Sequence, residues 1–144
     1  MRAALLLALA VAACATTPSA DAPLPPFPTF PRETAGANER IYLAAASYGR
    51  LTLQGNCLGM TGSGGGFATV VWPYTASLRR DARGLFVIDA DSGAKLRLGD
   101  WMVFGSGPTD GDTAYDSPLS EPVSAECRNR MIALSPGFDK HRRP

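Results

Sequence analysis

Few side chains in this sequence are of the types that carry out catalysis, and most of those are carboxylates. The single histidine, His141, stands in a charged C-terminal stretch where we expect a frayed tail. Ser-His-Asp and Cys-His mechanisms need a base that packing holds in place, so His141 does not predict either mechanism. Asp89 and Asp100 fall in turns that one end of a barrel could bring together for glycoside chemistry. Acids in turns mostly satisfy backbone donors, so we expect no enzyme; the alternative is a cell-wall-acting hydrolase with this carboxylate pair.

The ligand patterns predict neither a metal ion nor a cofactor. Asp89 and Asp91 precede Gly93 as at the start of a calcium loop, but the bidentate glutamate that closes such a loop is missing. Three further acids fall close together, at Asp110, Asp112 and Asp116. We interpret them as solvated turn residues, with a weak calcium site as the alternative.

The glycine-rich stretch Thr61–Gly66 has the composition of a phosphate-binding loop. It lacks the Lys-Ser/Thr pair of a P-loop, and it leads into a strand-like segment where a P-loop needs a helix. Thr61 also stands where a nucleophile elbow needs glycine. We therefore predict a hairpin loop.

Three aromatic residues are the candidate ligand contacts, because rings at a barrel mouth stack against sugars or peptides. They are Trp72, Tyr74 and Trp101. Core packing is the alternative for both tryptophans. The only local charge excess is Arg79-Arg80-Asp81-Ala82-Arg83, which we interpret as a solvated loop face. Contact with lipid headgroups or an anionic ligand is its alternative.

The N-terminal residues have the pattern of a targeting segment. Arg2 precedes an uninterrupted apolar run over residues 3–13, which suits a signal peptide and is shorter than the roughly 20 residues that span a bilayer. The ending Val11-Ala12-Ala13-Cys14 resembles the lipobox of bacterial lipoproteins. The resemblance implies removal of residues 1–13 and a diacylglycerol, with fatty acids such as palmitate, on Cys14. An ordinary secretory signal with an Ala-x-Ala cleavage site is the alternative.

The same resemblance implies a location. Lipoproteins of this kind stay at the inner membrane when Asp follows the acylated cysteine, whereas Ala15 stands here. We therefore expect a lipid-anchored protein of the cell envelope, at the outer membrane and facing the periplasm. Loss of Arg2 would leave 13 of the 14 basic residues, equal to the 13 acidic ones. Without a basic stripe, no nucleic acid partner is expected.

Cys57 and Cys127 remain in the domain. An exported chain occupies an oxidising compartment, where two thiols usually pair, so we predict a disulfide. Two buried free cysteines are the alternative.

Proline divides the chain into a tether and a domain. Residues 18–31 hold six of the 12 prolines, so we expect residues 14–37 to form an extended spacer behind the acylated cysteine. Residues 38–135 have the length of one modest domain, and residues 136–144 form a flexible tail.

The domain reads as all-β, because short apolar runs alternate with glycine and aspartate turns. The expected strands are Leu51–Leu53, Phe67–Trp72, Leu85–Ile88, Lys95–Leu98 and Trp101–Phe104. A sheet this small exposes its edges unless it closes, so we predict a small closed or partly open barrel of about five or six strands. Its inward-facing residues would be Val70, Trp72, Phe86, Ile88, Leu96, Leu98, Met102 and Phe104.

The order of glycine and apolar positions resembles small β-domains of bacterial lipoproteins, which are similar to OB-like barrels. The positions are Gly49-x-Leu51, Cys57-Leu58, Val70-Val71-Trp72-Pro73, Gly84-x-x-x-Ile88 and Leu98-Gly99-Asp100-x-x-x-x-Gly105. The resemblance implies a fold over residues 49–134 and no activity. We expect a non-catalytic, membrane-anchored binding or assembly module whose ligand is an envelope protein or a glycan.

Overall fold

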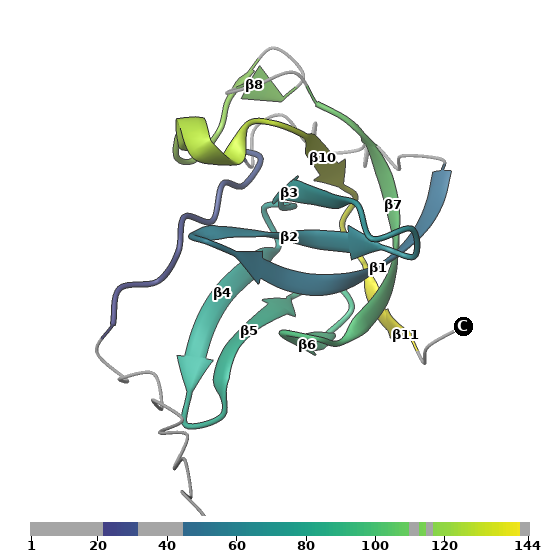
Figure 1. Ribbon diagram of the computed structural model, residues 1–144. Coiled ribbons are helices and arrows are strands. Elements are labelled where there is room, and N and C mark those ends of the chain that lie inside the picture. The colour runs from purple at the N-terminus through teal and green to yellow at the C-terminus, as the bar shows by residue number, and fades with distance from the viewer. Residues whose placement is uncertain (1–21, 32–44, 110–112, 115–116, 142–144) are drawn as a thin grey trace, which may run out of the picture.

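The computed structural model describes residues 22–31, 45–109, 113–114 and 117–141. These residues form an all-β fold in which six strands share a curved sheet and three strands form a smaller one (Figure 1). The signal peptide at residues 1–13, Cys14, and the acids Asp110, Asp112 and Asp116 lie outside the described residues.

Five strands form a ring. Strand β1 (Ala45–Gln54) pairs with β2 (Cys57–Gly62), β2 with β3 (Phe67–Val71), β3 with β10 (Met131–Leu134), β10 with β7 (Trp101–Pro108), and β7 with β1. Every pairing is antiparallel except that of β3 with β10. This ring confirms the small, partly open, OB-like β-barrel expected from the sequence.

Strand β7 closes the ring because its eight residues pair along both edges. One edge runs against β1, from Trp101 to Ser106. The other edge is shared between β10 and β11 (Asp139–His141). The remaining elements are the short strands β8 (Thr113–Ala114) and β9 (Ser117–Pro118) and the 3-10 helix η2 (Ala125–Cys127).

A three-stranded sheet is inserted between β3 and β7. It consists of β4 (Ala76–Asp81), β5 (Gly84–Asp89) and β6 (Lys95–Arg97), in that order. The β4–β5 turn ends at Gly84, whose φ of 103° is a conformation that favours glycine. Leu78, Val87 and Leu96 are cross-strand neighbours on the inner face, where they join the barrel core.

The main core lies inside the ring and under the inserted sheet. It contains Leu51, Leu58, Met60, Val70, Trp72, Ala76, Val87, Leu96, Met102, Phe104, Leu134 and Phe138. Of the residues expected to face inward, Val70, Trp72, Leu96, Met102 and Phe104 are buried there.

Three of the expected inward positions were wrong. On β5 it is Val87 that faces the core. Phe86 is buried, but on the outer face, where the Lys95 ammonium lies 3.8 Å from the ring centroid. Ile88 shares that outer face. Four consecutive apolar residues carry no alternation, so the sequence could not set the phase of this strand. Leu98 is 41% exposed because β6 ends at Arg97 and the chain turns there.

The N-terminal segment 22–31 is part of the fold, although the sequence assigned it to the spacer. The backbone N–H of Trp72 donates to the Pro28 carbonyl and that of Phe30 to the Trp72 carbonyl, each at 2.9 Å. The ring of Phe27 stacks on Trp72 with centroids 5.0 Å apart. A proline-rich backbone is already extended, so it can lie along a strand wherever aromatic side chains supply apolar contacts.

The C-terminal end also departs from the expected flexible tail. Phe138 is buried in the core, and Asp139 to His141 pair with β7. The buried Phe138 ring and a hydrogen bond from the Gly137 N–H to Asp89 hold this segment after a bend at Pro136-Gly137, and its backbone then completes the edge of β7. Residues 142–144 lie outside the described residues.

Candidate functional site: a cleft beside the disulfide

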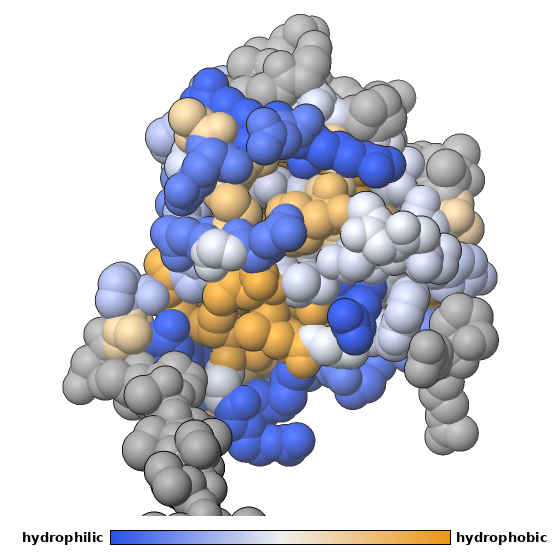
Figure 2. All heavy atoms as spheres, viewed as in Figure 1, coloured by the Kyte–Doolittle hydropathy of each residue, from blue (hydrophilic) through white to orange (hydrophobic). Residues whose placement is uncertain are grey.

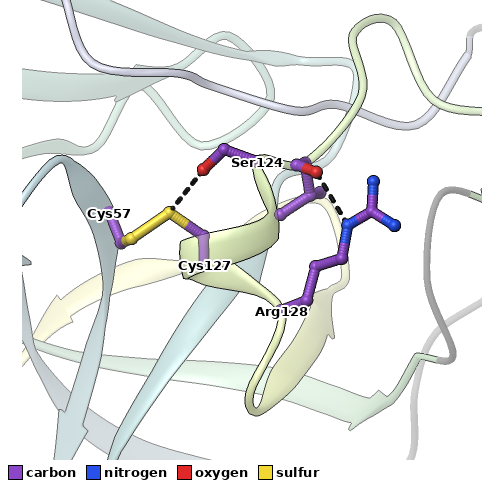
Figure 3. Close-up of a disulfide and its surroundings, with 5 residues drawn as sticks. Cys57, Ser124, Cys127 and Arg128 are labelled. Carbon is purple, nitrogen blue, oxygen red and sulfur yellow. Dashed lines mark hydrogen bonds between the residues drawn. A yellow bond between two sulfur atoms is a disulfide. The ribbon is translucent and has the colours of Figure 1, made fainter.

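The predicted disulfide is present. Cys57 begins β2, Cys127 ends η2, and their Cα atoms are 5.5 Å apart (Figure 3). The Ser124 hydroxyl lies 3.1 Å from the Cys127 sulfur, and Arg128 Nε donates to the Val123 carbonyl at 2.9 Å. The bridge and these contacts hold the β7–β10 connection against the β1–β2 turn.

A cleft of about 370 Å³ opens beside this bridge, a volume within the range of small-ligand sites. Three pieces of the fold form its walls: the β1–β2 turn, strand β3, and the segment from η2 to β10. The lining residues are Gln54, Gly55, Asn56, Cys57, Phe67, Thr69, Glu126, Cys127, Asn129 and Arg130. The backbone N–H of Thr69 donates to the Arg130 carbonyl at 2.9 Å, which fixes two of the walls to each other.

Apart from the buried Thr69, the polar side chains of the cleft are exposed and unpaired. None of the five makes a hydrogen bond or an ion pair with another residue in the described part of the chain: Gln54, Asn56, Glu126, Asn129 and Arg130. The half-buried ring of Phe67 packs against the disulfide cluster between them. Amides offer both donors and acceptors, so the cleft can bind a ligand rich in hydroxyl or amide groups. Its described lining holds no free thiol and no histidine.

Cys57, Glu126 and Cys127 bring three potential metal-ligand atoms within 4.8 Å of one another. Both sulfur atoms belong to the disulfide, and a metal ligand must be a thiolate. Only the exposed carboxylate of Glu126 remains for a cation at this place, so the group does not make a metal site.

A second, more open hollow of about 570 Å³ lies next to the N-terminal segment. Its lining is mostly apolar and includes Leu24, Phe27 and Leu78. Figure 2 shows apolar side chains gathered on this face, between the ring strands and the β4–β5 hairpin. Asn56 lines both hollows, so the two adjoin at the β1–β2 turn.

The carboxylates of the hydrolase alternative both accept structural hydrogen bonds. Asp89 is fully buried and accepts from the Ser92 hydroxyl at 2.9 Å and the Gly137 N–H at 3.0 Å. Asp100 accepts from Lys140 Nζ at 2.8 Å and the Arg97 N–H at 2.9 Å. Partial burial acts to raise the pKa of Asp100, but these bonds outweigh it and lower the pKa. Neither carboxylate lines the cleft beside the disulfide.

None of the three aromatic candidates lines this cleft. Trp72 is fully buried between Phe27 and Phe138, so its role is core packing, the alternative that the sequence left open. Tyr74 and Trp101 are half-buried, and neither belongs to the cleft lining. The glycine-rich stretch is the predicted hairpin loop between β2 and β3, where the Gly62 N–H donates to the Gly66 carbonyl at 3.0 Å.

Sequence reasoning missed the residues that do form the cleft. Gln54 and Asn56 flank a glycine just before Cys57, and Asn129 and Arg130 follow Cys127. The available signal was polar residues next to both cysteines, since a disulfide brings its flanking residues together.

No protein family, curated protein or solved structure matches this chain. Within the described ranges, no helix has the length and apolar character needed to cross a bilayer.

Proposed function

We propose that this chain is a lipid-anchored protein of the cell envelope whose barrel binds a glycan, without catalysis, in the cleft beside the disulfide. The observation that carries the proposal is the set of five unpaired polar side chains around the half-buried Phe67 ring. Sugars are recognised by such an arrangement, because amides bond their hydroxyls and an aromatic ring contacts their C–H faces.

The position of the cleft in the barrel supports this ligand class. In OB-like barrels, oligonucleotides and oligosaccharides bind over the second and third strands and the loops that follow the first and fourth. The cleft uses β3, the β1–β2 turn and the β7–β10 connection, which are the corresponding parts of this ring. The balance of acidic and basic residues favours a neutral glycan over a nucleic acid.

The anchor is supported by the sequence of the targeting segment. A basic residue, an apolar run and small residues before Cys14 together resemble a lipobox. Acylation there, with Ala15 in the next position, would place the barrel on the periplasmic side of the outer membrane.

Glycan binding is tested by titrating the purified protein with chitotetraose, a soluble oligomer of N-acetylglucosamine, in a calorimeter. We expect saturable binding that weakens about tenfold in Asn129→Ala and in Arg130→Ala, because each change removes a hydrogen-bonding group. Arg50→Ala is the matched control: Arg50 is an exposed arginine on β1 outside the cleft, so this variant should bind as the parent does. Absence of binding, or equal weakening in the control, would contradict the proposal.

A further inference from the structure

The β4–β5 hairpin carries a group of three arginine residues. Arg79, Arg80 and Arg83 fall within five positions around Asp81. Figure 1 shows this hairpin extending from the barrel on the side where the described chain begins, at the opposite end from η2. The hairpin therefore projects as a separate basic surface.

The N-terminal segment is held at this hairpin. Both terminal nitrogens of the Arg80 guanidinium donate to its backbone carbonyls, one to Ala22 and the other to Pro23 at 3.3 Å. Ala22 follows Cys14 by eight positions in the chain. Because a residue spans at most about 3.6 Å, Ala22 lies no more than about 29 Å from the acylated residue of the proposed anchor.

The acidic member of the hairpin is neutralised within the sheet. Asp81 accepts two hydrogen bonds from the Arg97 guanidinium, at 2.9 and 2.6 Å, and one from Lys95 at 3.4 Å. By contrast, the exposed side chains of Arg79 and Arg83 make no hydrogen bond or ion pair with any other described residue. Leu24, beside the hairpin at the apolar hollow, is 47% exposed. The surface thus offers free positive charge next to an exposed apolar side chain.

We propose that the β4–β5 hairpin rests on the anionic headgroups of the bilayer that holds the acyl chains of Cys14, an inference that rests on the proposed anchor. Charge complementarity supports this partner, since arginines close to an anionic leaflet are attracted to it. The contact adds little to retention, which the acyl chains provide. Its consequence is orientation: the tip of the hairpin faces the lipid, and η2, which contributes to one wall of the cleft, lies on the side away from it.

The test uses the full protein, purified from membranes and reconstituted into vesicles that contain nitroxide-labelled headgroups. Ala82→Cys, at the exposed hairpin turn, carries a fluorophore. We expect severalfold stronger quenching in vesicles of phosphatidylglycerol mixed with phosphatidylcholine than in phosphatidylcholine alone. The difference should shrink as salt is added and vanish in the double variant Arg79→Ala/Arg83→Ala. The matched control Arg50→Ala/Arg130→Ala removes the same charge elsewhere and should retain the difference in quenching between the two kinds of vesicle.

Fatty-acid labelling of the same preparation separates the two proposals. If the protein is acylated but the hairpin fluorophore is not quenched, the hairpin contact is wrong and the anchor stands. Equal loss of quenching in both double variants would also overturn the contact, because the effect would then depend on the net charge of the protein and not on the arginines of the hairpin. If no fatty acid is attached, the anchor fails, and the inference about orientation fails with it.

Discussion

The carboxylate of Asp89 is completely buried, yet its oxygens meet the Ser92 hydroxyl, the Ser92 N–H and the Gly137 N–H within 3.2 Å. A buried carboxylate without such donors would cost several kcal/mol. Here it closes the β5–β6 turn and fastens the C-terminal segment to it. A side chain of the type used in catalysis thus serves the fold, because burial and backbone donors leave it no access to a substrate.

Two other carboxylates make stability depend on pH. Hydrogen bonds from Arg97 chiefly lower the pKa of Asp81, and for Asp100 the bonds from Lys140 and Arg97 outweigh the opposing effect of burial. Both groups therefore bind protons more weakly in the folded chain than in the unfolded chain, where the pKa is near 3.8. Their contribution is complete above that pH and is lost as the pH falls below it towards the folded-state pKa values.

We expect the free energy of unfolding to decrease between neutral pH and a pH of about 3, and to decrease less in Asp81→Asn. Urea unfolding of both proteins at the two pH values measures the difference. Glu126→Gln, which removes an exposed carboxylate with no described partner, should follow the parent. Identical pH dependence in Asp81→Asn and the parent would contradict the assignment.

At the scale of the elements, the N-terminal segment of residues 22–31 belongs to the fold, although its proline-rich sequence does not indicate this. Its Thr29 forms a parallel bridge with Trp72, and its backbone N–H donates to the Ser120 hydroxyl at 2.9 Å. The backbone N–H of Phe27 donates to the carboxylate of Glu121. Residues 22–31 therefore pack between the end of β3 and the β7–β10 connection, and they cover the ring of Trp72.

Phe27→Ala should lower the free energy of unfolding by about 2 kcal/mol, because it removes a half-buried ring stacked on Trp72. Tryptophan emission should also shift to longer wavelength as the Trp72 indole gains contact with water. Leu24→Ala, in the same segment but 47% exposed, serves as the control and should change stability by less than about 0.5 kcal/mol. Unchanged stability in Phe27→Ala would mean that the segment does not hold the core.

At the scale of the whole molecule, the disulfide joins strand β2 of the ring to the β7–β10 connection, at two cysteines that lie 70 residues apart in the chain. We expect reduction of the disulfide to leave the strands paired and to release the β7–β10 connection, whose residues form one wall of the cleft. If the cleft binds a glycan as proposed, the same bond therefore affects both stability and binding.

The double variant Cys57→Ala/Cys127→Ala should lose about 4 kcal/mol of unfolding free energy, because a loop of this length gains entropy in the unfolded chain. Urea unfolding of the variant, and of the parent with and without reductant, measures the loss. Reductant should leave the unfolding free energy of the variant unchanged. It should lower that of the parent to nearly the value of the variant. A parent whose unfolding does not respond to reductant under denaturing conditions would contradict the bridge.

Attachment to the membrane is tested at Cys14. The Cys14→Ser variant should lose all labelling by a fatty-acid analogue and keep residues 1–13, since the resemblance to a lipobox makes acylation the condition for cleavage. Gel fluorescence and the mass of the intact protein report the two results. Cys57→Ala is the control for labelling, and its signal should persist. Labelling that survives in Cys14→Ser would contradict the anchor.

Several features of the fold and one of the candidate site could be predicted from the sequence. Glycine and aspartate turns separate short apolar runs, and such runs are shorter than typical helices and rich in β-branched residues, so the all-β class followed from local rules. Closure followed from the cost of open edges in a small sheet. The Cys57–Cys127 pair followed from two cysteines in a chain expected to be exported.

Only the tertiary structure decided which faces and segments came together. The side of β5 that meets the core, the docking of residues 22–31, the burial of Asp89 and the polar lining of the cleft all depend on partners far away in the chain. The apolar run Leu85–Ile88 fits either face equally well, and a proline-rich segment is extended whether it is docked or free. The physical reason is that burial and pairing are set by the energy of long-range contacts, which no local pattern of residues encodes.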